Sequence, residues 1–256
     1  MVNKFDKVLY KKDKKKIVYE IKDIVEEKAH IKGLNYRIFR IVLLSDLVLA
    51  KKEEIDKENI ISEKYYNKII SSGKREKRKY LLGRVLHVDG DENYLEKCLE
   101  LYKSLGVFAE GVRIEEKEMP NKIEYYLDKV NPDIIVITGH DLYNQKGLKE
   151  IENYANTRYY METVRKIRVK KSSYDCCVIA GACQSNFEAL IASGADFASS
   201  PKRINVHTFD PAVLAIKVAS TSFVRLVDVD EALKYIENGK DAYSGVETLG
   251  KMKLML

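Results

Sequence analysis

Short apolar runs alternate with amphipathic helical patterns from residue 84 to the end of this 256-residue chain. The runs are rich in Val and Ile, which favours buried strands, and the segments between them carry apolar residues at helical spacing. This alternation predicts an α/β fold with a doubly wound, mostly parallel sheet and right-handed crossovers. The expected strands are 84–88, 107–114, 134–138, 177–180 and 197–199, and the expected helices are 92–105, 122–130, 157–167, 186–192, 211–220 and 231–238.

The first 50 residues have a different pattern, in which short β-branched and aromatic runs are separated by charged breaks. Several short strands in so few residues predict a small SH3/tudor-like β-barrel. Apolar residues at helical spacing follow, and then a polar, basic stretch. We therefore predict a barrel domain over 1–50, a helical and basic linker over 51–83 and an α/β domain over 84–256. The expected barrel strands are 7–10, 17–25, 29–31, 36–43 and 45–49.

Composition excludes several classes of protein. Hydrophobic residues make up 45% of the chain and charged residues 33%, which is ample for a core and a solvated surface. The net charge of +6 comes from interleaved basic and acidic residues, so we expect no nucleic-acid partner. Four cysteines without paired spacing favour reduced thiols, and without Cys-x-x-Cys or a His cluster we expect no metal and no other cofactor. No apolar run reaches transmembrane length, so we expect a cytoplasmic protein without a membrane partner.

Two of the predicted strands end in residues that can do chemistry. The strand at 177–180 runs into a small-residue turn that delivers Cys183, and the strand at 134–138 ends in Gly139 and His140. The carboxyl ends of parallel strands meet at one edge of the sheet, which would bring the thiol and the imidazole side by side. We expect Cys183 at an exposed edge, activated by the helix that follows, because a helix N-terminus stabilises thiolate. Nucleophile and base together are what covalent cysteine catalysis needs.

The chain has three other histidines. His207 follows Cys183 in the order found in glutamine amidotransferases, but those enzymes place Glu two residues after His, where this chain has Phe209. His207 therefore stands as the alternative base. His30 lies in the predicted barrel and His87 inside the first α/β strand, and we interpret both as core histidines.

The apolar strand–Gly–His and apolar strand–Ala–Cys pair resembles the caspase, legumain, gingipain and separase group of cysteine peptidases. This resemblance favours a caspase/flavodoxin-like sheet, although Asp141 stands where that group usually has Gly. It implies that the thiol of Cys183 attacks a scissile carbonyl and that His140 protonates the leaving amine. The backbone amides of Gly139 and Cys183 are the candidates for an oxyanion hole.

Four longer motifs resemble the YabG family of sporulation proteases, over roughly residues 84–250 and only loosely in the N-terminal part. The resemblance implies an arginine-specific peptidase that processes spore coat proteins or a cortex-lytic proenzyme, in the mother-cell cytoplasm or on the spore coat. It places His140 and Cys183 at the positions such an enzyme needs. The motifs are Val-Leu-His-Val-Asp-Gly-Asp-Glu-Asn-Tyr-Leu-Glu-Lys-Cys-Leu at 85–99, Val-Ile-Thr-Gly-His-Asp at 136–141, Ala-Gly-Ala-Cys-Gln-Ser-Asn-Phe-Glu at 180–188 and Gly-Ala-Asp-Phe-Ala-Ser-Ser-Pro at 194–201.

Selectivity for arginine requires a carboxylate near the site, because a guanidinium pairs bidentately with one. Asp89 and Asp91 end the first α/β strand and are our substrate-binding candidates, whereas Asp141 and Asp210 are weaker ones. Asp91 has an alternative role, since it could simply cap the helix that follows.

The basic stretch between the two predicted domains offers arginines to an arginine-selective enzyme. Arg75 and Arg78 are the autocleavage candidates, unless the segment is helical and covered. Two non-peptidase alternatives remain open. A receiver-like signalling domain would share the acidic end of the first strand, and a spore coat scaffold would need no chemistry at all.

Overall fold

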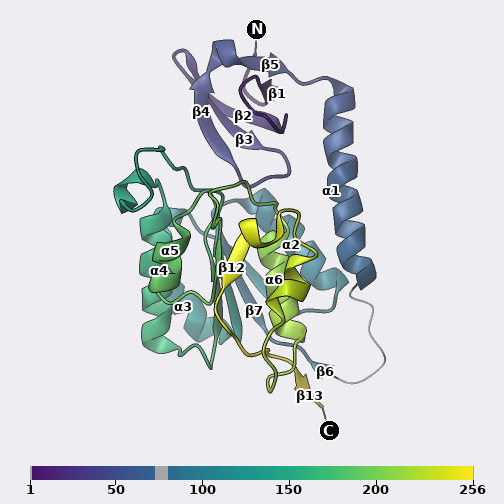
Figure 1. The fold of residues 1–256 in the computed structure, drawn as a ribbon, viewed down its shortest axis with the longest axis vertical. Helices are drawn as coiled ribbons and strands as arrows, with labels where there is room; N and C mark the ends of the chain where they lie inside the picture. The colour runs from purple at the N-terminus through teal and green to yellow at the C-terminus, as the bar shows by residue number, and fades with distance from the viewer. Residues whose placement is uncertain (1, 73–79, 256) are drawn as a thin grey trace.

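The computed structural model describes residues 2–72 and 80–255. An antiparallel sheet built from the N-terminal strands lies at one end of a larger α/β unit, and a long helix runs from this sheet down the side of that unit (Figure 1). The elements are β1 (Lys7–Tyr10), β2 (Val18–Val25), β3 (Lys28–Gly33), β4 (Phe39–Leu43), β5 (Leu47–Leu49), α1 (Lys52–Ser72), β6 (Tyr80–Leu81), β7 (Val85–Asp89), α2 (Glu92–Ser104), β8 (Ala109–Arg113), α3 (Met119–Val130), β9 (Ile134–Thr138), α4 (Thr157–Lys170), β10 (Cys177–Ala180), α5 (Phe187–Ala192), β11 (Phe197–Ser199), α6 (Asp210–Ser220), α7 (Val229–Leu233), β12 (Tyr243–Gly245) and β13 (Lys253–Leu254).

The larger sheet has the order β12-β11-β10-β9-β7-β8, and every neighbouring pair is parallel except β11 with β12. The predicted mostly parallel α/β sheet is therefore confirmed. Its closer likeness to caspases or flavodoxins stays a prediction.

Both faces of this sheet are covered, which explains why its strands read as continuous apolar runs. Successive side chains of a strand point to opposite faces, so alternate residues enter two separate cores. Helices α2 and α6 cover one face, and α3, α4 and α5 cover the other (Figure 1). The first core receives Val85, Ile134, Val136, Cys177 and Ile179, and the second receives Leu86, Val88, Ile135, Ile137, Val178 and Ala180.

The N-terminal sheet has the order β4-β3-β2-β1-β5 and is antiparallel throughout. Its apolar side chains belong to the same hydrophobic cluster as the α2–α6 face of the large sheet, so the core is continuous between the two sheets. Helix α1 is tied to the α/β unit by hydrogen bonds from Tyr65 to Asp210 and between Tyr66 and Ser104, both 2.7 Å long. The barrel assignment and the domain limits at 50 and 83 stay predictions.

Several elements differ by a few residues from the predicted boundaries, and two of these differences have a clear structural cause. The strand expected at 36–43 begins only at Phe39, because Tyr36 and Arg37 pair with residues 206–208 instead. The helix expected at 231–238 is short, since after α7 the main chain closes tighter bonds, from Tyr235 to Ala232 and from Ile236 to Leu233.

One side chain fastens α4 to the sheet and to the turn after α5. Arg168 donates to the carbonyls of Gly194 (2.7 Å) and Cys176 (2.8 Å) and pairs with the carboxylate of Asp196. Replacing it leaves these partly buried acceptors without a donor. We expect Arg168→Met to lower the free energy of unfolding by about 3 kcal/mol in chemical denaturation. The exposed Arg165→Met, on the same helix, should change it by less than about 0.5 kcal/mol. Equal effects of the two changes would contradict this assignment.

Candidate active site

The two candidate catalytic residues and one substrate-binding candidate lie at the carboxyl ends of three neighbouring parallel strands. Asp89 ends β7, His140 follows β9 and Cys183 follows β10, and β9 pairs with both β7 and β10. The structure thus brings the predicted thiol, imidazole and carboxylates to one edge of the sheet. Within the described part of the chain, no hydrogen bond joins His140 to Cys183 directly.

The turn that carries Cys183 is held in an unusual backbone conformation. Gly181 has a φ of 103°, and a Cβ atom there would collide with the hydroxyl of Ser199. Gln184 also has a positive φ, of 62°, and its amide donates to the hydroxyl of Ser200 at 2.9 Å. Such backbone is tolerated where the surroundings determine it, and functional sites are where it concentrates.

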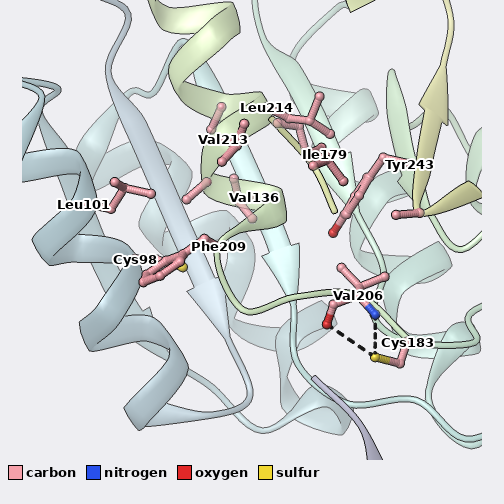
Figure 2. Close-up of a cluster of buried hydrophobic side chains, with 14 of the residues drawn as sticks. Cys98, Leu101, Val136, Ile179, Cys183, Val206, Phe209, Val213, Leu214 and Tyr243 are labelled. Carbon is pink, nitrogen blue, oxygen red and sulfur yellow. Dashed lines mark hydrogen bonds between the residues drawn. The ribbon is translucent and has the colours of Figure 1, made fainter. Parts of the chain in front are cut away.

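The thiol of Cys183 is fully buried, which differs from the exposed and activated cysteine that the sequence predicts. Its Sγ atom accepts a hydrogen bond from the amide of Val206 at 3.1 Å and lies 3.7 Å from the carbonyl oxygen of the same residue (Figure 2). Burial raises the pKa of the thiol to about 12. Helix α5 starts only at Phe187, so its N-terminus does not offset the loss of water.

His140 is held by a carboxylate. Its Nε2 atom lies 3.0 Å from Oδ2 of Asp91, which also pairs with Lys32. Burial opposes ionisation of Asp91, but the hydrogen bond and charge of His140 and the charge of Lys32 lower its pKa below the usual value. An ionised carboxylate cannot donate, so Nε2 of His140 carries the hydrogen of this contact and Nδ1 is the ring nitrogen that remains. That Nδ1 atom is buried and has no hydrogen-bond partner among the described residues.

Asp141 connects the His140 loop to the Cys183 turn. Its carboxylate accepts from the hydroxyl of Ser185 at 2.9 Å, and that hydroxyl accepts from the amide of Ala182 at 3.0 Å. The carboxylate of Asp141 also accepts hydrogen bonds from the backbone amides of Leu142 and Asn156. Although these hydrogen bonds, and a further one from the hydroxyl of Thr157, favour the charged form, burial raises the pKa of Asp141 to about 6. Asp141 therefore positions the two loops, and its oxygens are not available as a pocket acid.

Sequence reasoning missed Glu116. Its carboxylate accepts the backbone N–H of His140 at 2.8 Å and lies where a side chain at Gly90 or Gly139 would be. Glycine at both positions makes room for this contact. Glu116 stands in the charged run 115–118, which looks like an ordinary solvated surface, so no sequence signal singles it out. The oxyanion-hole assignment of the Gly139 and Cys183 amides stays a prediction.

Both predicted substrate-binding carboxylates already have partners. Asp91 caps α2 by accepting from the amide of Tyr94 at 3.2 Å, as its alternative role required. Asp89 is fully buried and binds a guanidinium of this same chain, that of Arg37, at 2.7 Å. Burial disfavours its charge, yet Arg37 holds the pKa of Asp89 below its usual value. Arg37 was not singled out from the sequence, because nothing local distinguishes it from the other basic residues.

The other candidates lie away from this arrangement or carry other contacts. His207 is buried, accepts the amide of Phe209 on Nδ1 at 3.3 Å, and has its pKa lowered by burial to about 3. His87 is a core histidine beside Tyr102, as predicted. His30 is half-buried on β3 and contacts Phe39. Asp210 accepts from Tyr65 and from the amide of His207.

The remaining predictions concern metal ligands, membrane-spanning helices and sites of self-cleavage. Among residues 2–72 and 80–255, no group of three or more His, Cys, Asp or Glu side chains could hold a metal ion. The described helices include none that is long and apolar enough to cross a membrane. The autocleavage candidates Arg75 and Arg78 lie outside the described residues.

Comparison with known proteins assigns the chain to a family. The model of the family described as YabG peptidase U57 matches residues 3–256, so the likeness reaches through the N-terminal part as well as the α/β unit. The chain is also similar to a protein of Bacillus subtilis named sporulation-specific protease YabG. The two are 44% identical over 178 residues, which is 68% of this chain and 61% of that protein. From its first strands to its last, this chain belongs to the YabG peptidase U57 family.

Proposed function

We propose that this chain is a cysteine endopeptidase in which Cys183 is the nucleophile and His140 the proton-transfer group. The observation that carries the proposal is the placement of both residues after neighbouring parallel strands, with Asp141 and Ser185 joining their loops. Family membership and the name of the Bacillus subtilis relative support a peptidase role in sporulation.

The proposed reaction proceeds through a thioester. The sulfur of Cys183 attacks the scissile carbonyl carbon, and its proton passes to His140. The peptide C–N bond then breaks, and His140 returns the proton to the departing amine. Water hydrolyses the thioester, which restores the thiol and releases the new carboxylic acid. The amides of Gly139 and Cys183 are the proposed donors to the oxyanion.

The contacts of His140 support this role. Asp91 orients the ring through Nε2, and the unpartnered Nδ1 can accept a proton from the thiol or deliver one to the leaving group. An unpaired polar atom in a buried place is costly, and a site of proton transfer is one setting in which it is retained. The lowered pKa of His207 leaves it a weaker base.

Asp89 is the carboxylate that we propose binds the guanidinium of a substrate arginine. This carboxylate already binds a guanidinium, and it lies at the same sheet edge as His140 and Cys183. We expect Asp89→Asn to lower the preference for an arginine peptide over its citrulline analogue by about 10²-fold or more, because a buried charge pair is lost.

Asp91→Asn is the matched comparison for that experiment. It should slow both peptides together, because it disturbs the partner of His140 rather than the guanidinium site. The measurement is the ratio of kcat/KM values for the two peptides, made on variants whose circular dichroism matches the wild type. If Asp89→Asn keeps the full preference, the pocket acid lies elsewhere.

The proposed substrates are spore coat proteins or a cortex-lytic proenzyme, met in the cytoplasm of the mother cell or on the spore coat. No cofactor is part of the proposed chemistry. The test of the function is cleavage of an arginine-containing peptide by the purified chain, blocked by alkylation of Cys183 with iodoacetamide and unaffected by a metal chelator. A receiver-like domain or a coat scaffold would give no cleavage.

We further propose that the enzyme cuts itself after Arg75 or Arg78. The stored wild-type chain should then lose its N-terminal part, while the Cys183→Ala chain stays whole under the same conditions. Intact-mass spectrometry of both proteins decides this. A wild-type chain that stays whole while it cuts an added peptide would rule out self-cleavage at these two positions.

A further inference from the structure

The loop between β3 and β4, residues 34–38, lies across the candidate active site. It belongs to the N-terminal sheet, yet its hydrogen bonds reach the α/β unit. Tyr36 forms an isolated antiparallel bridge with His207. The amide of Arg37 donates to the carbonyl of Val206 at 2.9 Å, and the amide of Thr208 donates to the carbonyl of Asn35 at 3.2 Å. We refer to residues 34–38 as the β3–β4 loop.

The segment that pairs with this loop, residues 206–208, also contacts the proposed nucleophile, Cys183. The carbonyl oxygen of Val206 accepts from the amide of Arg37 and also lies 3.7 Å from the sulfur of Cys183. The backbone of Arg37 and the thiol therefore meet at one atom. Extended peptides commonly bind by adding a strand to an exposed edge, with main-chain hydrogen bonds of this kind. Residues 206–208 offer such an edge, and the β3–β4 loop already occupies it.

The side chain of Arg37 is enclosed beside residues 206–208. It is fully buried, and its guanidinium lies 2.7 Å from Asp89 and 3.2 Å from the carbonyl oxygen of Thr208. The face of the Tyr94 ring lies 5.1 Å from the guanidinium carbon. A carboxylate, a carbonyl and an aromatic face are the groups that recognise arginine.

Neighbouring residues cover the rest of the site. Lys32 pairs with Asp91, the carboxylate that orients His140, and the ring of Phe39 lies 6.0 Å from the His140 ring. Cys183 has no exposed surface in this arrangement. A peptide that paired with residues 206–208 would have to displace the β3–β4 loop, which already pairs with them.

We propose that the β3–β4 loop occupies the substrate-binding site of this chain, with Arg37 in the place of the substrate arginine, and that it must withdraw before a substrate is cut. This inference rests on the proposed peptidase function and names how its substrate binds. The substrate is an extended peptide that pairs with residues 206–208 and inserts its arginine toward Asp89.

The backbone of the β3–β4 loop has a conformation that is unsuited to cleavage. The amide of Gly33 donates to the carbonyl of Ile38 at 2.8 Å, which closes the base of the loop. The amide of Ile38 also reaches back to the carbonyl of Tyr36 at 2.8 Å, so the chain curls at Arg37 instead of running extended. Ile38 itself is buried in the core. A curled, anchored bond at Arg37 is a poor substrate.

A disulfide can lock the loop in place. Tyr36 and His207 are a non-hydrogen-bonded antiparallel pair, whose Cα atoms lie about 4.5 Å apart in regular sheets, within the range that disulfides span. In the full-length Tyr36→Cys/His207→Cys protein, peptide mapping confirms the bond after oxidation. Cleavage of an arginine peptide should fall to below about 1% of that of the same protein after reduction with dithiothreitol. Wild-type protein taken through the same oxidation is the control for damage to Cys183.

Opening the loop should have the opposite effect. Arg37→Ala removes the side chain that anchors it, so iodoacetamide should label Cys183 about ten-fold faster or more than in the wild type, as located by peptide mass spectrometry. Lys28→Ala, at an exposed position that begins β3 in the same hairpin, is the control and should leave the labelling rate unchanged. If Arg37→Ala fails to fold, the oxidised Tyr36→Cys/His207→Cys protein still tests whether the loop blocks the site.

The failures of the two proposals are distinguishable. If wild-type and reduced double-variant proteins cut the peptide and the oxidised protein cuts it equally fast, the loop does not occupy the substrate site and only this inference fails. If none of the proteins cuts any peptide, the peptidase proposal fails. The labelling of Cys183 then still reports on the loop, and equal rates in the locked and reduced proteins would overturn the inference.

Discussion

Replacing Cys183 with Ala should abolish cleavage of an arginine peptide, with kcat/KM at least about 10⁴-fold below that of the wild type. The thioester cannot form without the sulfur. The measurement is peptide turnover under reducing conditions, with circular dichroism to show that the protein is folded.

The controls for this change follow from the contacts of the thiol. Ala leaves the amide of Val206 without its acceptor, whereas Cys183→Ser keeps an acceptor atom there and should be closer to the wild type in stability. Cys176→Ala removes another buried thiol, in the second core, and should retain turnover. Turnover by Cys183→Ala within ten-fold of the wild type would remove this cysteine from the mechanism.

Replacing His140 with Ala should lower turnover by about 10²–10⁴-fold, the usual contribution of a positioned acid–base group. Binding should suffer less, because the substrate arginine is held by Asp89 and not by the imidazole. The measurement is therefore kcat and KM separately, with most of the loss expected in kcat. His30→Ala, on the N-terminal sheet, is the matched control and should keep its kcat.

His207 is the alternative base, and variants at His207 could contradict the prediction for His140. His207 follows Val206, whose amide donates to the Cys183 sulfur, but burial lowers the pKa of the His207 ring to about 3. A His140→Ala protein with near-normal kcat, together with a His207→Ala protein that has lost it, would assign proton transfer to His207.

Asp141 shows how a departure from a family pattern can be interpreted once the structure is known. In the sequence it stands where the caspase-like peptidases usually have Gly, which raises the question of how the oxyanion site is built. In the structure its carboxylate joins the His140 loop to Ser185 in the Cys183 turn. A buried acid with several donors is a suitable tether, because each donor fixes the direction of another loop.

The sequence alone determined the α/β unit and the edge at which its chemistry gathers. The strands at 134–138, 177–180 and 197–199 have the same bounds in the structure, because short apolar runs suit strands of a parallel sheet that is covered on both faces. Parallel strands put their carboxyl ends on one side, so the approach of His140 and Cys183 followed from their positions after consecutive strands. The family motifs carried the assignment further, and the match over residues 3–256 confirms it.

Only the tertiary structure decided what covers that edge. Arg37, Lys32 and Phe39 are unremarkable in sequence, and they reach Asp89, Asp91 and His140 because two sheets distant in the chain share one core. The state of the thiol was likewise undetermined, since a pKa depends on water access and on neighbouring charges. Local sequence suggested a helix N-terminus beside Cys183, but full burial of the thiol, next to Val206, outweighs it and raises the pKa of Cys183 to about 12. Strand order follows from local patterns, whereas burial of a particular atom depends on every segment that packs over it.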